Sequence, residues 1–580
     1  MSEIAERAVP AAIVKPKLSS DDWIMRAFMG VIGLYLVVAL ALPLYTMLSK
    51  SFEDHDGAFI GLANYVEYFQ TPALAYSINN SLYVAVLTTF ITVILAFTFA
   101  YAMTRSCTPF KGLFKIITMI PILVPSLLPG IALVYLFGNQ GLMKWLMFGH
   151  NIYGPIGIVI SEVFFTLPHA IIIIVTSLAI ADARLYEAAV SLRASKLRIF
   201  FTVTLPGCRY GLISAAFVVF TLAITDFGAP KVIGGDFNVL ATDIYKQVIG
   251  QQNFEMGAVV SMVLLIPAVF AFAVDRVVQR KQVALLSARA VALDPLPDRK
   301  FDMMMLAYCI FISIFLVGML AICQYAALVK FYPYDLSWGL NNYQFDLMDG
   351  GGWDAYTNSI KMATFTAIFG TLVVFVGAYM VEKGKGFHYG RALFQFLAMM
   401  PMAVPGLVLG LAYIFFFNQA PISLGFLGFP DTQIKVDGLY HTMAILVIST
   451  TIHFYTVSHL TAVTALKQMD TEFEAVAASL KQPFYKTFWR VTVPVCLPAI
   501  FDISIYLFVN AMTTVSAVVF IYGPDTALAS VAVLNMDDAG DIAPAAAMGM
   551  MIFYTAAGVR ILHYFVSRFI ERRTQRWKMR

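Results

Sequence analysis

The sequence predicts an all-α polytopic membrane protein with about twelve transmembrane helices. Its 580 residues are 60% hydrophobic and only 13% charged, whereas soluble domains are about 25% charged. The apolar residues are gathered in blocks longer than the ~18 residues that cross a bilayer as a helix. Such segments must be helical in lipid, because every backbone N–H and C=O needs a partner within the segment.

The apolar blocks divide the chain into spans, loops and tails. We expect a polar N-terminal tail at 1–26, a first half at 27–277, a linker at 278–302, a second half at 303–567 and a basic tail at 568–580. The first block has no clear small-residue cleavage site, so we expect an uncleaved tail rather than a signal peptide. The expected spans are 27–48, 80–103, 113–137, 154–180, 209–228, 257–274, 303–328, 358–381, 392–417, 441–466, 497–520 and 544–566.

Lysine and arginine are distributed unevenly between the two sides of these spans. If the N-terminus is inside, the inner loops and both tails hold 30 of the 39 basic residues, and the outer loops hold six. Basic loops stay on the cytoplasmic side of a membrane, so we expect both termini in the cytoplasm. The basic residues of 568–580 are expected to bind anionic lipid at the bilayer surface. A specific partner site in this tail is the alternative.

Several classes of protein are disfavoured by what the sequence lacks. No G-x-x-x-x-G-K-[ST] segment occurs, so we do not expect the chain to bind and hydrolyse ATP. No nucleophile–base set predicts a catalytic site, and no ligand spacing predicts a metal site. Nucleic acid is not an expected partner, because the basic residues lie in short loops rather than along one face. The five cysteines are scattered and are expected to be apolar filler: Cys107, Cys208, Cys309, Cys323 and Cys496.

The sequence contains an internal repeat, with two copies of one unit. Asn80-Ser81 recurs as Asn358-Ser359, and Leu205-Pro206 recurs as Val493-Pro494. A proline-rich pattern in the third span recurs in the ninth: Pro121, Pro125, Gly130 and Ala132 correspond to Pro401, Pro405, Gly410 and Ala412. Since each copy has six spans, the copies have the same orientation and form parallel repeats about an axis normal to the membrane.

Each half has a long polar loop between its fourth and fifth spans, at 182–206 and 470–494. The first loop predicts a helix with an acidic residue near its N-terminal end, which suits the helix dipole. Leu205-Pro206 is expected to end that element and lead back into the membrane. In the second loop Lys481 precedes Pro494 by the same interval as Arg193 precedes Pro206.

These loops resemble the EAA loop of binding-protein-dependent ABC importer permeases, whose pattern is about EAA-x3-G-x9-I-x-LP. The resemblance covers 77–277 and 355–570 and implies the type I importer permease fold, with two parallel six-helix repeats. In that family the loop forms a coupling helix that docks on the ATP-binding subunit. The residues implied are Glu187, Ala188, Ala189, Leu205 and Pro206 in the first loop, and Ala475, Ala478, Pro494 and a displaced Glu474 in the second.

Both loops depart from this family pattern at one position. Arg193 and Lys481 stand where the family has glycine. Glycine allows a sharp bend at little steric cost, so its replacement argues against such a bend. It also places a basic residue on the surface expected to face the ATPase. The alternative for both segments is an ordinary amphipathic cytoplasmic loop.

Polar residues within the spans predict a translocation path. The candidates lie near the outer ends of the fifth and eleventh spans: Thr225, Asp226, Asn510, Thr513 and Thr514. The alternative is that they cap helix ends. Glu162 and His453 lie deeper, and we expect His169 and His459 to be a buried, satisfied packing pair rather than a proton relay. The prolines of the third and ninth spans, including Pro129, are expected to kink or break them.

The resemblance implies a permease that works by alternating access in a bacterial inner membrane. Its implied partners are two copies of an ATPase subunit carrying ATP and magnesium, and a periplasmic solute-binding protein on the outer loops 49–79, 229–256, 329–357 and 418–440. No cofactor is expected on this chain. The segments DFGAPKVIGGDF, FEAVAASL and TFWRVTVP most resemble 2-aminoethylphosphonate importer permeases, with fused ferric-iron permeases as the alternative. An ion-coupled secondary transporter is a rival from another class. It would need a coupling-ion site of carboxylates near the midplane, preferably in both halves, and neither Asp226 nor Glu162 recurs.

Overall fold

A computed structural model describes residues 20–180, 182–284, 293–384, 386–418, 422–423, 433–434, 437–470 and 472–574. Within these residues, seven uninterrupted helices and five bent helix pairs have the length and apolar character of membrane spans. If each bent pair counts as one span, they make up the twelve spans expected from the sequence. The all-α polytopic fold class is therefore confirmed.

The first half contains the elements α1 to α14. They are α1 (Ser20–Leu36), α2 (Leu42–Lys50), α3 (Ala63–Gln70), α4 (Pro72–Arg105), α5 (Lys111–Thr118), α6 (Leu127–Phe137), α7 (Pro155–Ala179), α8 (Ala183–Ser191), α9 (Lys196–Ile199), α10 (Leu205–Gly207), α11 (Arg209–Thr225), α12 (Gly228–Ile233), α13 (Leu240–Tyr245) and α14 (Phe254–Ala284). A π-helical turn, Val37–Ala41, joins α1 to α2.

The second half repeats the order of the spans, and two small hairpins are added. Its elements are α15 (Arg299–Leu328), β1 (Val329–Phe331), β2 (Asp335–Trp338), α16 (Gly352–Lys383), α17 (His388–Met399), α18 (Gly406–Phe417), β3 (Ile422–Ser423), β4 (Gln433–Ile434), α19 (Met443–His453), α20 (Tyr455–Lys467), α21 (Glu472–Ser479), α22 (Phe484–Thr487), α23 (Val493–Val495), α24 (Leu497–Thr513), α25 (Ala529–Ala539) and α26 (Ile542–Thr574). Both hairpins are antiparallel, with Val329 opposite Trp338 in the first.

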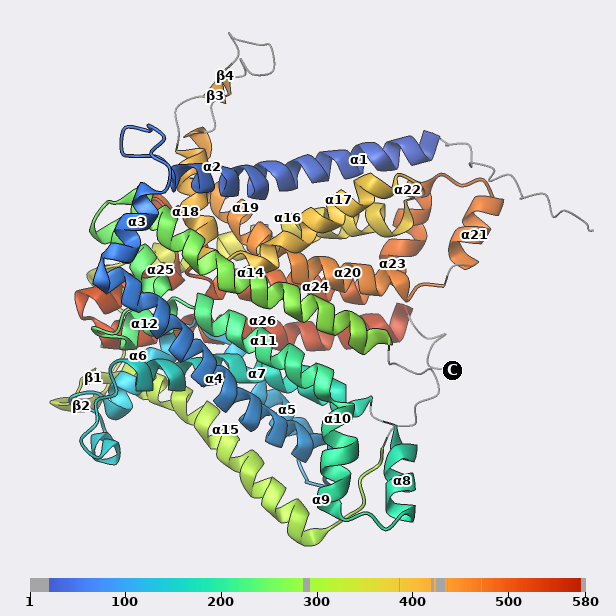
Figure 1. Ribbon diagram of the computed structural model, residues 1–580, viewed down its shortest axis with the longest axis horizontal. Helices are drawn as coiled ribbons and strands as arrows, with labels where there is room; N and C mark the ends of the chain where they lie inside the picture. The colour runs from blue at the N-terminus through green and yellow to red at the C-terminus, as the bar shows by residue number, and fades with distance from the viewer. Residues whose placement is uncertain are drawn as a thin grey trace, which may run out of the picture.

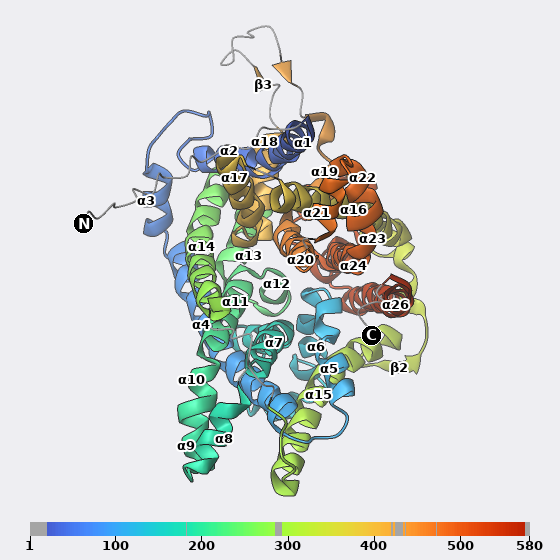
Figure 2. The same cartoon turned by 90° about the vertical axis from the view of Figure 1, so that its right-hand side faces the viewer.

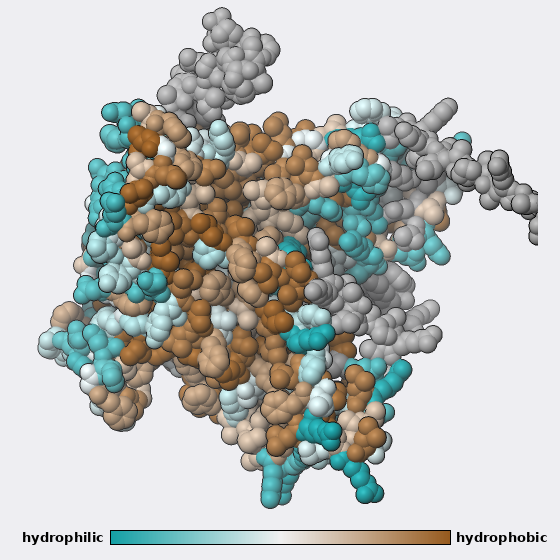
Figure 3. All heavy atoms as spheres, in the orientation of Figure 1, coloured by the Kyte–Doolittle hydropathy of each residue, from teal (hydrophilic) through white to brown (hydrophobic). Residues whose placement is uncertain are grey.

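The long helices run roughly side by side, so the bundle has two ends (Figure 1). Elements α8, α9, α21 and α22 lie at one end, which we call the α8/α21 end, and α12, α25, β1 and β2 lie at the other, the α12/α25 end. Helix α1 begins and α26 finishes at the α8/α21 end, as an even number of spans requires. The surface between the two ends is mainly hydrophobic on the face shown in Figure 3, and such a surface suits the lipid core.

The first helix of each half packs on the other half. Helix α1 contacts α16 and α17, and α15 contacts α4, α5 and α6 (Figure 2). Two tyrosines strengthen this exchange. The buried Tyr413 in α18 donates to the carbonyl of Ala39 at 2.6 Å, and the partly buried Tyr308 in α15 donates to that of Leu95 at 2.8 Å. The divisions at 27–277 and 303–567 therefore describe the order of the repeats along the chain, while the packing interlocks them.

The third and ninth spans are broken, as their prolines predict. The helix axis turns by 102° between Leu123 and Leu127 and by 113° between Ala403 and Gly406. Proline lacks the N–H that an unbroken helix would need at these positions. Three further bends were not predicted: 63° before Arg209, 58° at Phe454 and 75° before Leu497.

Two predicted spans end earlier in the structure. The fifth was expected to reach residue 228, but α11 ends at Thr225, because Asp226 is extended and accepts a hydrogen bond from the Ala229 N–H in the first turn of α12, at 2.9 Å. The eleventh was expected to reach residue 520, but α24 ends at Thr513, because Thr514 is also extended. Both helices therefore stop at equivalent residues of the two repeats.

The Asn-Ser motif of the repeats has the same structural role in both halves. The Ser81 hydroxyl accepts a hydrogen bond from the Leu240 N–H at 2.8 Å, and the Ser359 hydroxyl accepts one from the Ala529 N–H at 2.8 Å. These bonds satisfy donors in the first turns of α13 and α25, which have no partner within their own helices. The motif thereby fixes a short helix to a long span at the α12/α25 end.

Candidate coupling loops and translocation path

Helix α8 carries the EAA residues of the first loop. Asp182 precedes the helix and accepts a hydrogen bond from the Arg184 N–H at 3.1 Å, as an N-cap aspartate does. Ala189 is buried on one face of the helix, whereas Glu187 and Ala188 are exposed. The helix thus presents its acidic residue outward, on a surface available to a partner.

A sharp bend follows α8, although arginine replaces the family glycine there. Arg193 has a φ of 55°, which is the left-handed conformation. Its N–H donates to the Val190 carbonyl at 2.8 Å, and the next N–H, of Ala194, donates to the Ala189 carbonyl at 3.0 Å. These two bonds form the Schellman motif that ends many helices. The expectation that arginine would remove the bend is therefore wrong, because the two hydrogen bonds compensate its steric cost.

The second loop has the same bend at Lys481, whose φ is 50°. The Gln482 N–H donates to the Ala477 carbonyl at 3.0 Å. When the loops are aligned on their bends, Ala477 takes the position of Ala189, and Ala475 that of Glu187. Glu474 and Ala478 belong to α21, but their side chains lie outside the described part of the structure.

Each loop returns to the membrane through a helix that ends one residue after its proline. Residues Lys196–Gly207 are helical throughout, with a π-helical turn at Phe200–Thr204 just before Leu205-Pro206. The second loop repeats this arrangement, with a π-helical turn at Phe488–Thr492 before Pro494. Proline cannot donate the hydrogen bond of a regular α-helical turn, and a wider turn accommodates it. The helix ends at Gly207, and the chain turns by 63° into α11, so the predicted end of the element at Leu205-Pro206 is confirmed to within one residue.

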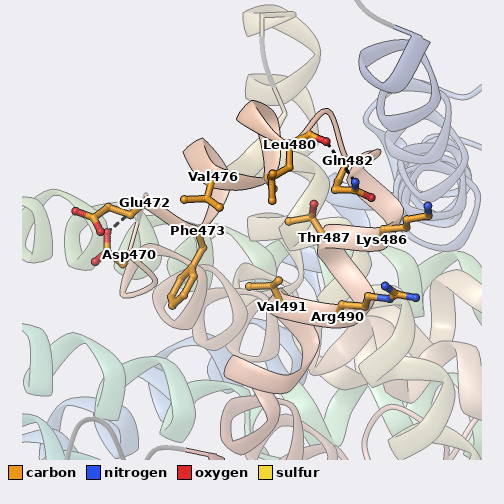
Figure 4. A pocket seen from close by; sticks show the side chains of 11 residues that line it. Asp470, Glu472, Phe473, Val476, Leu480, Gln482, Lys486, Thr487, Arg490 and Val491 are labelled. Carbon is orange, nitrogen blue, oxygen red and sulfur yellow. Dashed lines mark hydrogen bonds between the residues drawn. The ribbon is translucent and has the colours of Figure 1, made fainter.

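A cavity of about 480 Å³ opens beside α21 at this end. Figure 4 shows that its side chains come from both arms of the second loop. Apolar residues form much of the wall, with Asp470 and Glu472 at one side and Lys486 and Arg490 at the other. The apolar residues are Phe473, Val476, Leu480 and Val491. The loop therefore offers a hollowed surface of mixed charge to a partner.

The predicted path residues occupy equivalent positions at the ends of α11 and α24. The Thr225 hydroxyl donates to the Thr221 carbonyl at 2.8 Å, and the Thr513 hydroxyl donates to the Val509 carbonyl at 3.2 Å. The Asn510 amide likewise donates to a carbonyl of its own helix, at 2.8 Å. The Thr514 side chain is buried. Among the described contacts, these hydroxyl and amide groups thus donate to carbonyls of their own helices. The alternative that these residues cap helix ends predicts such bonds too.

Glu162 and Asp226 form a carboxyl pair in the first half. Glu162 is fully buried in α7, and the Asp226 side chain lies next to it. Neither Glu162 oxygen has a partner of normal hydrogen-bond geometry in the described residues. Nothing in the sequence spacing indicated this contact.

The two histidines that recur in the repeats pack against aromatic rings: His459 is buried, as predicted, whereas His169 is only partly buried. His459 is 2% exposed and lies against Tyr455, with ring centroids 5.8 Å apart. His169 lies against Phe165 at 6.1 Å. Their Nδ1 atoms have no hydrogen-bond partner of normal geometry among the described residues, so the expectation that both rings are satisfied is not confirmed. The described residues also contain no group of three His, Cys, Asp or Glu that could hold a metal ion.

The two halves meet through a charged contact that the sequence did not indicate. Lys231 in α12 forms an ion pair with Asp538 in α25, with Nζ and Oδ1 2.8 Å apart. The Lys231 ammonium also lies over the Tyr245 ring, and that ring stacks on Phe520 of the second half at 6.2 Å. These contacts close the interface between the halves at the α12/α25 end.

A bundle of twelve spans, built from two interlocked repeats with a long polar loop in each, is the architecture of a polytopic membrane protein. The chain belongs to the family of binding-protein-dependent transport system inner membrane components, which matches residues 92–283 and 374–572. The two matches lie one in each half. The chain is thus the permease subunit of an ABC importer, with both repeats in one polypeptide.

Two proteins are similar to this chain over most of its length. One is the ferric transport system permease protein FbpB of Actinobacillus pleuropneumoniae, 28% identical over 92% of this chain and 77% of its own length. The other is a putative ferric transport system permease protein of Haemophilus influenzae, 26% identical over 89% of this chain and 80% of its own. Both are transport permeases. A solved bacterial ABC transporter involved in the import of alginate matches 46% of this chain and 97% of its own, at 14% identity and a TM-score of 0.38.

Proposed function

We propose that this chain forms the translocation path of an ATP-driven importer and is moved by two copies of a separate ATPase subunit at the α8/α21 end. The observation that carries the proposal is the pair of equivalent bent loops at that end. Each loop has a short exposed helix, a basic residue whose backbone is in the left-handed conformation, and a second helix that continues into a span. ATP and magnesium belong to the ATPase, and this chain acts by coupling and not by catalysis.

The α12/α25 end is proposed to receive a periplasmic solute-binding protein, with both chain termini on the cytoplasmic side of a bacterial inner membrane. The Lys231–Asp538 pair supports this arrangement, because it joins the halves at the end opposite the coupling loops. Opening of that contact, driven from α8 and α21, would admit a solute between the halves by alternating access. Thr225, Asp226, Asn510, Thr513 and Thr514 lie at the helix ends beside this opening.

Ferric iron is the cargo that the similar proteins favour, since both relatives that extend along the chain are named as ferric transport permeases. The 2-aminoethylphosphonate prediction rests on segments such as 226–237, and the comparisons do not support it. In the structure that segment forms α12, which packs on α6 and α7. An ion-coupled carrier is the candidate function from a second class of transporter. The Glu162–Asp226 pair favours it, but it has no equivalent pair in the second half, where Thr514 replaces Asp226.

The coupling proposal is tested by co-purification and uptake. A Glu187→Arg variant reverses an exposed charge on α8 without changing a buried contact, so the protein should fold normally. We expect its capture of the ATPase and its uptake both to fall at least fivefold. Thr364→Ala is the matched control, since Thr364 is exposed and bonds to the carbonyl of Ile360 in its own helix. Normal ATPase capture and uptake by Glu187→Arg, or uptake without any ATPase, would reject the proposal.

The cargo is tested in cells that carry the chain with its ATPase and binding protein. Uptake of radioactive iron supplied as Fe(III)-citrate is compared with uptake of labelled 2-aminoethylphosphonate. We expect iron uptake that disappears when the chain is deleted. Phosphonate uptake with no iron uptake would reject ferric iron as the cargo while leaving the coupling proposal intact.

A further inference from the structure

The start of α15 is bonded to the coupling loop of the first half. The Asp298 carboxylate lies 2.7 Å from the Lys196 ammonium, in the first turn of α9. Asp298 also accepts a hydrogen bond from the Phe301 N–H at 3.4 Å and so caps α15. The bonded Lys196 holds the pKa of Asp298 below its usual range. One aspartate therefore joins the first helix of the second half to the loop of the first half.

The start of α1 makes the reciprocal connection. The Asp21 carboxylate accepts a hydrogen bond from the Phe484 N–H at 2.9 Å. Phe484 is the first residue of α22, which follows the bend of the second coupling loop as α9 follows that of the first. Here an aspartate at the start of the first half's own first helix satisfies a backbone donor in the loop of the second half.

Each of these first helices also touches a second loop at the same end. Asp302 in α15 accepts a hydrogen bond from the Cys107 N–H at 2.8 Å, in the turn between α4 and α5. The Arg26 guanidinium in α1 lies 5.4 Å from the centre of the Phe387 ring, in the turn between α16 and α17. The turns are equivalent in the two repeats. Each first helix thus connects the coupling loop of the opposite half to that half's second and third spans.

We propose that Asp21 and Asp298 are positioning residues of a crossed link, in which the first helix of each half carries the displacement of the opposite half's coupling loop into the bundle. The inference rests on the proposed coupling function. Because α1 and α15 pack along the opposite half, a pull on either loop moves spans of both repeats. The contacts persist through the transport cycle, and their loss uncouples ATP hydrolysis from uptake.

The Lys196–Asp298 contact can be removed without disturbing a helix end. Asp298→Asn keeps an N-cap side chain for α15 but loses the charge, and Lys196→Ala removes a side chain that is 91% exposed. We expect either change, combined with Asp21→Ala, to lower Fe(III)-citrate uptake at least fivefold in the full transporter while ATPase capture and ATP hydrolysis stay within twofold. Arg198→Ala in the Asp21→Ala background is the matched control. Uptake equal to that control would overturn the proposal.

A cross-link tests whether the contact persists. Lys196→Cys and Asp298→Cys are combined in a Cys107→Ser background, because Cys107 is exposed and would compete, whereas the other described cysteines are buried. A short bis-maleimide then joins the two positions. We expect the cross-linked transporter to keep at least half the uptake of the same variant treated with a mono-maleimide. Uptake abolished only by the cross-linker would show that the contact must break, and would overturn the crossed link.

Failure of the two proposals is distinguishable by ATPase capture. If Glu187→Arg abolishes capture while the Asp298 and Asp21 variants transport normally, the coupling function stands and the crossed link falls. If Glu187→Arg captures the ATPase and transports normally, the coupling function itself falls, and the crossed link falls with it.

Discussion

Arg193 and Lys481 share one backbone conformation although 288 positions separate 193 from 481. Their φ angles are 55° and 50°, and both occupy the place of the family glycine after a short helix. A side chain in this conformation costs roughly 1–2 kcal/mol relative to a right-handed residue. The hydrogen bonds that close the bend, such as Ala194 N–H to Ala189 carbonyl, offset this cost. The bend is thus a property of the loop, with or without glycine.

Glycine at either bend should stabilise the protein without changing its transport. Arg193→Gly and Lys481→Gly remove the steric cost of a Cβ, so we expect each to raise the free energy of unfolding by about 0.5–1 kcal/mol. Arg193→Val, with a β-branched side chain, should lower it by at least ~1 kcal/mol. Thermal unfolding in detergent measures all three variants. Loss of uptake in Arg193→Gly with normal folding would instead show that the basic side chain itself contacts the ATPase.

The serine caps provide a direct test of the repeat. Ser81→Ala and Ser359→Ala each leave a helix-end N–H, of Leu240 or Ala529, without its acceptor. We expect a loss of about 1–2 kcal/mol for each, because both the donor and the acceptor are buried. Thr364→Ala, which removes an exposed hydroxyl, should change stability by less than ~0.5 kcal/mol. Clearly unequal losses for the two serines would contradict an equivalent role.

The twelve spans and the repeat were predictable because hydrophobicity and motif spacing are local properties of the chain. Pro125 and Pro405 likewise predicted the two bends at which they stand, since proline acts on its own turn. The exchange of α1 and α15 between halves was not predictable, because a repeat fixes the order of its helices and not which copy each one packs on. The bend at Phe454 also lacked a signal, since no proline or glycine stands at the break itself. The bend before Leu497 was not predicted either, although Pro498 stands in the first turn of α24.

The features of the candidate site were likewise predictable only in part. The coupling loops could be located from Glu187 and the Pro206 and Pro494 spacing, because polar residues between apolar blocks are visible in sequence. Their bend could not, since arginine seldom adopts a positive φ and only the surrounding hydrogen bonds select it. Contacts between distant segments, such as Lys231 with Asp538, depend on how the two repeats pack, and no periodicity encodes that.

The Lys231–Asp538 ion pair should bias the halves toward closure at the α12/α25 end. Both side chains are partly exposed, at 20% and 42%, so we expect a coupling energy of at most ~1 kcal/mol in a double-mutant cycle of Lys231→Ala and Asp538→Ala. Removing either partner should raise basal ATP hydrolysis severalfold at most, and high salt should have the same effect on the wild type. Additive effects of the two substitutions would show that the pair contributes nothing to closure.

Asp537, beside this ion pair, predicts a pH dependence of stability. Burial, and next the neighbouring Asp538 charge, raise the pKa of Asp537 from 3.8 to about 7, while Lys231 opposes the shift. Because the folded pKa is above the unfolded one, the stabilising contribution of the protonated form is complete below pH ~4 and is lost as the pH rises through 7.

The stability of Asp537→Asn should therefore match that of the wild type at pH 5 more closely than at pH 8. At pH 8 the variant should be more stable than the wild type by on the order of 2 kcal/mol. Unfolding temperatures between pH 5 and 8.5 measure this difference. Asp525→Asn, which removes an exposed carboxylate at the same end, is the control, and an equal change in both variants would exclude Asp537 as the cause.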